Sequence, residues 1–228
     1  MSDWLTYTPQ DFLLFSPRVY YRLIELHNEA LWPLQVAALA LGLLLLFATL
    51  RGGAAASRMA FAILGALWMW IAWSYLWERY ATINWAVAYA APLFAAQGLA
   101  LLWCGAIRDK LRLPPVMGLA SAAAAVLLAT AVIAYPLIAP LIAPLMGRPW
   151  TAAETFGIFP EPTALATLAV LACVPRGGAL LVVIPLLWCA LASEVLWLLG
   201  SPDFFIPATA ALAAVLLAIL RRRGETSD

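Results

Sequence analysis

The stretch LLVVIPLLWCALASEVLWLL, residues 180–199, decides the class of this protein, because its twenty residues carry a single charge, Glu194. A helix rises ~1.5 Å per residue, so a run of this length crosses a ~30 Å hydrocarbon core. A carboxylate inside such a span costs several kcal/mol unless it is paired, hydrated or protonated. Glu194 is therefore either a functional group or a polar contact that holds neighbouring helices together.

The composition of the whole chain agrees with this stretch. The 228 residues are 65% hydrophobic and 11% charged, whereas soluble domains are about 45–50% apolar and ~25% charged. A single water-soluble core cannot bury so much apolar surface, so we expect the membrane to be the solvent. The net charge of +1 gives no sign of nucleic-acid binding.

Seven apolar runs predict an all-α, polytopic transmembrane helix bundle of about seven spans between residues 32 and 220. The fifth run is short, and we keep it because the charge pattern of the loops alternates only if it crosses. The predicted spans are residues 32–50, 59–77, 83–107, 115–135, 163–174, 180–199 and 204–220.

The segment before the first span, residues 1–31, has a different character. Ser16-Pro17 is typical of a helix start, with a capping hydroxyl and proline at the first helical position. Apolar residues then recur at helical spacing and charged residues take the other side. We expect a short amphipathic helix that lies on the membrane surface.

The basic residues predict an orientation. With seven alternating spans and a cytoplasmic C-terminus, nine of the thirteen Lys and Arg residues fall on the inner side. The outer side keeps Arg18, Arg22, Arg79 and Arg148. This bias follows the positive-inside rule, so we expect an outside N-terminus and a basic, then polar, cytoplasmic tail at residues 221–228.

The fourth span carries three prolines at four-residue spacing, Pro136, Pro140 and Pro144. Each removes an intrahelical hydrogen bond and crowds the carbonyl four residues back. We expect the helix to bend or stop at Tyr135–Pro136. The following segment then either runs along the outer interface or re-enters the membrane, as the broken helices of transporters do.

Soluble-type catalytic machinery is not visible in the sequence. His27 is the only histidine, and the single lysine, Lys110, lies in a predicted cytoplasmic loop. A His-based zinc site, a bis-histidine haem and a Schiff base within a span therefore have no ligands. Cys104, Cys173 and Cys189 fit buried free thiols. We expect no catalytic residue, no cofactor and no metal.

Polar residues near the outer ends of several spans suggest a pocket. They form an outward-facing group with Glu194 at its floor, or they are polar residues that spans tolerate near an interface. The candidate pocket residues are Glu194, Ser193, Ser74, Tyr75, Arg79, Asn84, Tyr135, Thr209 and Gln35.

Four motifs carry a resemblance to a known family. They are HNEALWPLQ (residues 27–35), INW (83–85) with Gln97, TFGIFPEPT (155–163) and IPLLW (184–188). Together they resemble an uncharacterised family of bacterial multi-spanning inner-membrane proteins, a domain of unknown function. The resemblance implies a multi-pass protein of the bacterial cytoplasmic membrane and lends no activity. In the family pattern a cysteine commonly stands where this chain has Glu161.

The third motif has a physical interpretation as the outer entrance to the fifth span. Prolines restrict where the helix starts, Thr163 is able to cap it, and carboxylates are favoured near a helix N-terminus. The residues of this motif are Thr155, Phe156, Gly157, Pro160, Glu161, Pro162 and Thr163.

Two functions remain open at this point. The small size and odd number of spans favour a non-catalytic membrane subunit or sensor that acts through helix contacts. The alternative is a small transporter or channel-like protein with an outer-leaflet pocket around Glu194. Expected partners are the lipid bilayer and either a second copy of the chain or another membrane protein, with no nucleic acid.

Overall fold

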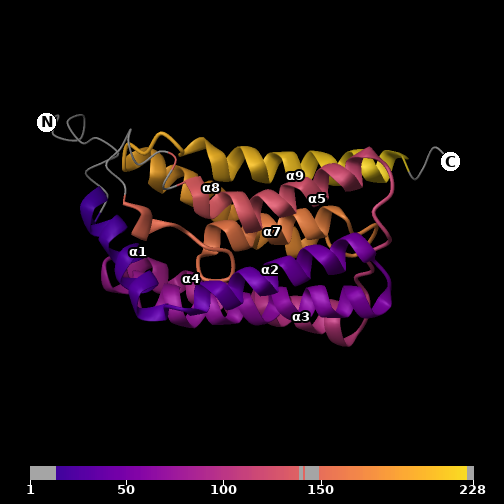
Figure 1. Ribbon diagram of the computed structural model, residues 1–228, viewed down its shortest axis with the longest axis horizontal. Helices are drawn as coiled ribbons and strands as arrows, with labels where there is room; N and C mark the ends of the chain where they lie inside the picture. The colour runs from indigo at the N-terminus through magenta and orange to yellow at the C-terminus, as the bar shows by residue number, and fades with distance from the viewer. Residues whose placement is uncertain (1–13, 139–140, 142–148, 225–228) are drawn as a thin grey trace, which may run out of the picture.

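The computed structural model describes residues 14–138, 141 and 149–224. This part of the chain is helical and contains no strand, apart from one isolated bridge between Phe156 and Phe159. Most helices run along the long axis of a bundle, and α1 lies at one end (Figure 1). The α-helices are α1 (Pro17–Leu31), α2 (Leu34–Arg51), α3 (Ala54–Ile71), α4 (Ala90–Leu101), α5 (Leu119–Ala129), α7 (Pro160–Ala172), α8 (Val183–Leu198) and α9 (Phe205–Gly224).

Shorter helical segments extend or join these helices. Three of them are π-helical, and their wider turns continue α3, α4 and α5 without a break. The π segments are η3 (Ala72–Trp77), η6 (Leu102–Ile107) and η7 (Thr130–Ala134), and the 3₁₀ segments are η4 (Tyr80–Thr82), η5 (Trp85–Tyr89), η8 (Trp150–Ala152) and η9 (Leu180–Val182).

Five helical stretches in the described residues are long and apolar enough to cross a membrane. They coincide with the predicted first, second, third, fourth and sixth spans. The apolar helix at Phe205–Arg221 is shorter, and α7 has only thirteen residues, so seven crossings stay a prediction. The five stretches are Leu34–Arg51, Ala54–Thr82, Trp85–Ile107, Leu119–Ile138 and Leu180–Leu198.

The structure excludes one of the two alternatives predicted for the fourth span. Helical backbone continues through Ile138, so a stop at Tyr135–Pro136 is wrong. Instead the backbone N–H of Tyr135 donates to the carbonyl of Thr130, five residues back, at the end of η7. Pro136 lacks an N–H and would crowd the carbonyl of Val132, and the wider π turn comes just before it. The predicted course after Ile138 falls mostly outside the described residues.

Helix α1 begins where the sequence indicates. The Ser16 hydroxyl accepts a hydrogen bond from the N–H of Val19 at 3.4 Å, and Pro17 takes the first helical position. The helix buries Tyr20 and His27 on its inner side. Its position on a membrane surface remains a prediction.

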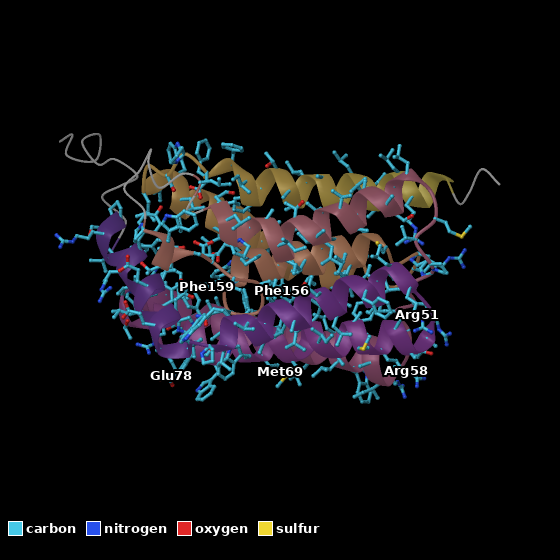
Figure 2. The ribbon with its side chains drawn as sticks, in the orientation of Figure 1. Arg51, Arg58, Met69, Glu78, Phe156 and Phe159 are labelled. Atoms are coloured by element: carbon cyan, nitrogen blue, oxygen red, sulfur yellow. The ribbon has the colours of Figure 1, made fainter. Side chains whose placement is uncertain are left out.

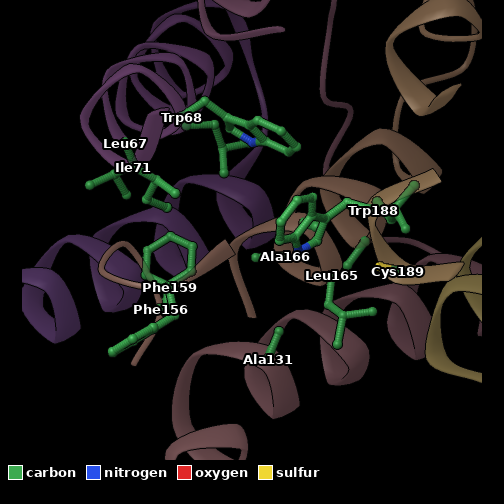
Figure 3. Packing of buried hydrophobic residues seen from close by; sticks show 14 of the residues in the cluster. Leu67, Trp68, Ile71, Ala131, Phe156, Phe159, Leu165, Ala166, Trp188 and Cys189 are labelled. Carbon is green, nitrogen blue, oxygen red and sulfur yellow. The ribbon is translucent and has the colours of Figure 1, made fainter. Parts of the chain in front are cut away.

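Helix α7 is the centre of the bundle. Every one of its residues is buried, and it contacts α3, α5, α8 and α9, which surround it in Figure 1. The indole N–H of Trp68 donates to the hydroxyl of Thr167 at 2.8 Å and fixes α3 against it. Figure 3 shows Trp188 of α8 beside Leu165 and Ala166 of α7.

The two ends of the bundle carry different groups. Arg51 and Arg58 lie at one end and Glu78 towards the other, where α1 lies (Figure 2). At the Arg51 end, Arg58 pairs with Asp109 at 3.5 Å. There Arg221 also donates to the carbonyls at the C-terminus of α7, where a cation is favoured by the helix dipole.

Candidate functional site

The segment that leads into α7, residues 153–159, folds back into the bundle; we call it the TFG segment. The carbonyl of Thr155 accepts hydrogen bonds from Ile158 and Phe159 at 3.1 and 3.0 Å. Gly157 has φ of +76°, and its N–H donates to the Thr163 hydroxyl at 2.8 Å. Residues 156–159 are fully enclosed. In a membrane, irregular backbone is tolerated where protein covers it or where it lines a water-filled cavity, and protein covers this segment.

The start of α7 corrects one prediction about this motif. The helix begins at Pro160, and its N-cap residue is Phe159, which makes no side-chain cap. Thr163 is therefore not the cap. Its hydroxyl donates to the carbonyl of Phe159 at 2.8 Å and ties the first turn to the TFG segment. Proline suits the first helical position, because the N–H that it lacks would have had no partner in the helix.

Two carboxylates are buried beside this turn. Glu154 and Glu161 are each only 4% exposed. Glu161 stands in the first turn of α7, where the positive end of the helix dipole favours an acid. The indole N–H of Trp188 donates to its Oε1 at 3.2 Å.

Four buried tyrosines lie near these acids or near one another; with Glu154 and Glu161 they form what we call the carboxylate–tyrosine cluster. The Tyr20 and Tyr75 rings lie 5.8 and 5.7 Å from that of Tyr80. Burial raises the pKa of Tyr20, and Tyr75, Glu161 and Glu154 raise it further through their charges. The charges of Glu154 and Glu161 also act on Tyr135. The tyrosines are Tyr20, Tyr75, Tyr80 and Tyr135.

Two of these tyrosines depend on π segments for their position. Tyr75 lies within η3, and Tyr135 directly follows η7. In η3 the residues Ser74, Tyr75 and Leu76 are all buried although they are consecutive. A π turn shifts the helical phase locally and is frequent at functional sites.

His27 borders the cluster from α1. It is 1% exposed, and its ring lies 5.2 Å from that of Tyr75 and 5.5 Å from that of Phe159. Neither ring nitrogen has a hydrogen-bond partner in the part of the chain that the structure describes. Burial, with a smaller effect of the Arg79 charge, lowers the pKa of His27 to about 4. The ring is therefore neutral at pH 7.

Asn28 joins the HNEALWPLQ motif to the chain just before the TFGIFPEPT motif. Its side-chain amide donates to the carbonyls of Thr151 and Ala153, both at 2.8 Å. Gln35 in turn donates to the Asn28 carbonyl at 2.9 Å and to its Oδ1 at 3.2 Å. The HNEALWPLQ motif thus holds the chain that enters the TFG segment.

The predicted pocket around Glu194 does not form as expected. Glu194 is exposed on α8, and the structure gives it no hydrogen bond or ion pair with any residue it describes. The predicted inward orientation is wrong. Residue 194 lies near the end of a helix that is one-third buried overall, and its phase on that helix turns the carboxylate outward.

The other predicted pocket residues divide into two groups. Some make local contacts: Ser193 accepts from the N–H of Ala208 at 3.0 Å, and Asn84 caps its own turn. Thr209 is exposed, whereas Gln35 and Arg79 are half-buried. Ser74, Tyr75 and Tyr135 are buried, and Tyr75 and Tyr135 belong to the carboxylate–tyrosine cluster.

Several residues of the cluster or in contact with it were not assigned to a site from the sequence. They are Tyr20, His27, Tyr80, Glu154 and Trp188. A signal did exist, because His27, Glu161 and Trp188 all lie within the motifs quoted above. Within the described residues, no three or more His, Cys, Asp and Glu side chains are arranged to hold a metal ion.

Comparison with known proteins gives a family and no activity. No curated protein matches the chain, and no solved structure matches it. Residues 17–227 match a family described as a family of unknown function, DUF6064. The match begins at the start of α1 and includes the four motifs. The chain therefore belongs to DUF6064, a family of unknown function whose member here has several helices that could span a membrane.

Proposed function

We propose that this protein is a non-catalytic membrane sensor, or the sensing subunit of a larger assembly, whose helix packing depends on the protonation of Glu154 and Glu161. The observation that carries the proposal is the burial of both acids among tyrosines from separate elements. Tyr20 comes from α1, Tyr75 and Tyr80 from the end of the α3 stretch, and Tyr135 from the end of the α5 stretch.

The physical link is the low dielectric of the site. A buried carboxylate stays charged only if hydrogen bonds or cations replace its water. Hydroxyl groups around it are polarised together, so one added proton changes several contacts at once. Here those contacts join α1 to the core of the bundle. Gaining or losing a proton therefore biases how α1 packs on the end of the bundle, and a partner helix is able to detect that change.

The proposal includes the location and the orientation expected from the sequence. The protein lies in a bacterial cytoplasmic membrane, with residues 1–31 at the outer surface and residues 221–228 in the cytoplasm. What supports this is the set of five helical stretches long and apolar enough to cross a membrane and the grouping of Arg51 and Arg58 at the end opposite α1 (Figure 2). The carboxylate–tyrosine cluster then faces the outer side and responds to the external pH.

Hydrogen exchange of α1 tests the sensor. The full chain in nanodiscs is compared between pH 5.5 and 8.5, after correction for the intrinsic pH dependence of exchange. All variants in this comparison carry His27→Phe, because His27, with a pKa of about 4 in the folded protein and 6.5 when α1 opens, would otherwise add its own pH dependence below pH 6.5. We expect α1 to exchange differently at the two ends of the range. Glu161→Gln keeps the shape and the acceptor for Trp188, and it should make α1 insensitive to pH.

Glu194→Gln is the matched control, because it removes an exposed carboxylate from the same bundle. It should leave the pH response of α1 unchanged. The sensor proposal fails if Glu161→Gln retains the full response in the His27→Phe background, or if α1 of the His27→Phe protein shows none.

A transporter is the second candidate, and the form of α7 favours it. Transporters build ion and substrate sites from half-length helices that follow irregular segments. Helix α7 has thirteen residues and follows the TFG segment. Liposomes that contain the protein and a pH-sensitive dye separate the two functions. Proton flux driven by a potassium diffusion potential, and lost in Glu161→Gln, would establish transport; a tight membrane with a pH-dependent α1 would establish the sensor.

A further inference from the structure

A pocket between α1 and the turn after η3 carries an inference that is independent of the carboxylate–tyrosine cluster. It has a volume of about 380 Å³, within the range of ~300–1,000 Å³ typical of small-molecule sites. We propose that this pocket binds the headgroup of an anionic phospholipid. Three arginines line it: Arg18 and Arg22 from α1, and Arg79 from the turn.

The charge of the lining is complementary to a phosphate. Glu78 is the one acid among the residues that form the wall. Arg22 already pairs with Glu25 at 2.7 Å and with Glu29 at 3.5 Å. Arg18 and Arg79 make no ion pair with any residue that the structure describes. Guanidinium groups present paired N–H donors whose geometry matches phosphate oxygens.

Apart from Thr82, the rest of the wall is apolar, which favours a lipid over a free anion. The apolar part consists of Val19, Leu23 and Leu26 of α1 and of Ile83. A soluble phosphate gains nothing from such side chains, whereas the glycerol ester and the first methylenes of an acyl chain bury against them.

The height of the pocket in the bundle also fits a headgroup. It lies at the end of the apolar stretch Ala54–Thr82, where a spanning helix leaves the hydrocarbon. Trp77 and Trp85, next to this turn, are 57% and 66% exposed. Exposed tryptophans mark the level of the headgroups in membrane proteins. An arginine-lined pocket at this level meets phospholipid phosphates directly.

Native mass spectrometry of the full chain, titrated with phosphatidylglycerol or phosphatidylcholine of equal acyl chains, tests the proposal. We expect the anionic lipid to bind more tightly. Arg18→Gln and Arg79→Gln should each weaken phosphatidylglycerol binding by about tenfold, the loss of one charge-assisted contact. Arg51→Gln, at the opposite end of the bundle, is the matched control and should change nothing.

A gain of affinity separates binding from misfolding. Glu78 is exposed and lines the pocket, so Glu78→Gln removes repulsion of the phosphate and should tighten phosphatidylglycerol binding. The proposal is overturned if both lipids bind equally and the arginine variants have no effect. It is also overturned if glycerol 3-phosphate displaces the lipid completely at matched concentration, because the occupant would then be a soluble phosphate.

Discussion

At the scale of single residues, His27 is the clearest case of a polar group held in an apolar place. Both ring nitrogens are buried without a hydrogen-bond partner in the described part of the chain, while Tyr75 and Phe159 pack on the ring. A neutral imidazole tolerates this environment far better than an imidazolium. Charging His27 therefore works against the docking of α1.

The pH dependence of stability follows from this with a definite sign. The pKa of His27 is about 4 in the folded protein and 6.5 when unperturbed. Between these values the unfolded chain binds more protons, so stability is lost as the pH falls from 6.5 to 4. The free energy of unfolding lost in this way is at most about 3 kcal/mol, at 1.36 kcal/mol per pKa unit. His27→Phe keeps the ring contacts and removes the titration.

Thermal melts in detergent at pH 7.5 and pH 4.5 measure the effect. The wild type should lose more stability than His27→Phe between the two pH values, and the difference between the proteins isolates His27 from the buried acids. Equal losses in both proteins would contradict the prediction.

Glu161 and Glu194 show how far the sequence specifies the site. Glu194 is the single charge in an apolar run, which predicts an inward orientation. Hydropathy does not reveal which face of the helix a residue occupies, and Glu194 is exposed. Glu161 stands between two prolines and has the sequence context of a surface turn. It is buried because the TFG segment folds inward and carries it to the centre, a tertiary effect that local composition cannot encode.

At the scale of elements, length and apolarity predicted the spanning stretches well. The predicted span at residues 180–199 corresponds to Leu180–Leu198, and that at residues 83–107 to Trp85–Ile107. The π segments were not predicted, because one extra residue in a turn leaves the composition unchanged. The prolines of the fourth span predict a distorted helix. The distortion takes the form of the π segment η7, which ends before Pro136.

The attachment of α1 to the TFG segment is a prediction at the same scale. The Asn28 amide donates to Thr151 and Ala153. Asn28→Asp keeps the oxygen that receives the Gln35 amide but replaces two donors with an acceptor that faces two carbonyls. Leaving such groups unsatisfied costs about 1–3 kcal/mol each, so α1 should exchange its amides faster. Asn84→Asp, in which Oδ1 still accepts from Ala86, is the control.

Peptide-level hydrogen exchange of α1 in nanodiscs measures this attachment. Protection of α7 should stay as in the wild type, since its residues are buried independently of α1. Unchanged exchange of α1 in Asn28→Asp would show that the two hydrogen bonds do not hold it.

At the scale of the whole molecule, the fold separates charge between its two ends. Arg58 and Arg112 both pair with Asp109 at one end, and Arg221 closes the C-terminus of α7 nearby. The other end holds α1 and the carboxylate–tyrosine cluster. Basic residues remain on the cytoplasmic side because translocating them is unfavourable. The asymmetry thus supports the proposed orientation, in which the cluster faces the outer side.

Cysteine labelling in intact cells tests this orientation. In a background with Cys104, Cys173 and Cys189 replaced by alanine, Asp3→Cys and Thr226→Cys each supply one thiol near an end of the sequence. With nine of thirteen basic residues on the inner side, a membrane-impermeant maleimide should label residue 3 in intact cells and residue 226 only after permeabilisation. Labelling of both in intact cells would require an even number of crossings, and the reverse pattern would place the carboxylate–tyrosine cluster on the cytoplasmic side, where it could respond only to internal pH.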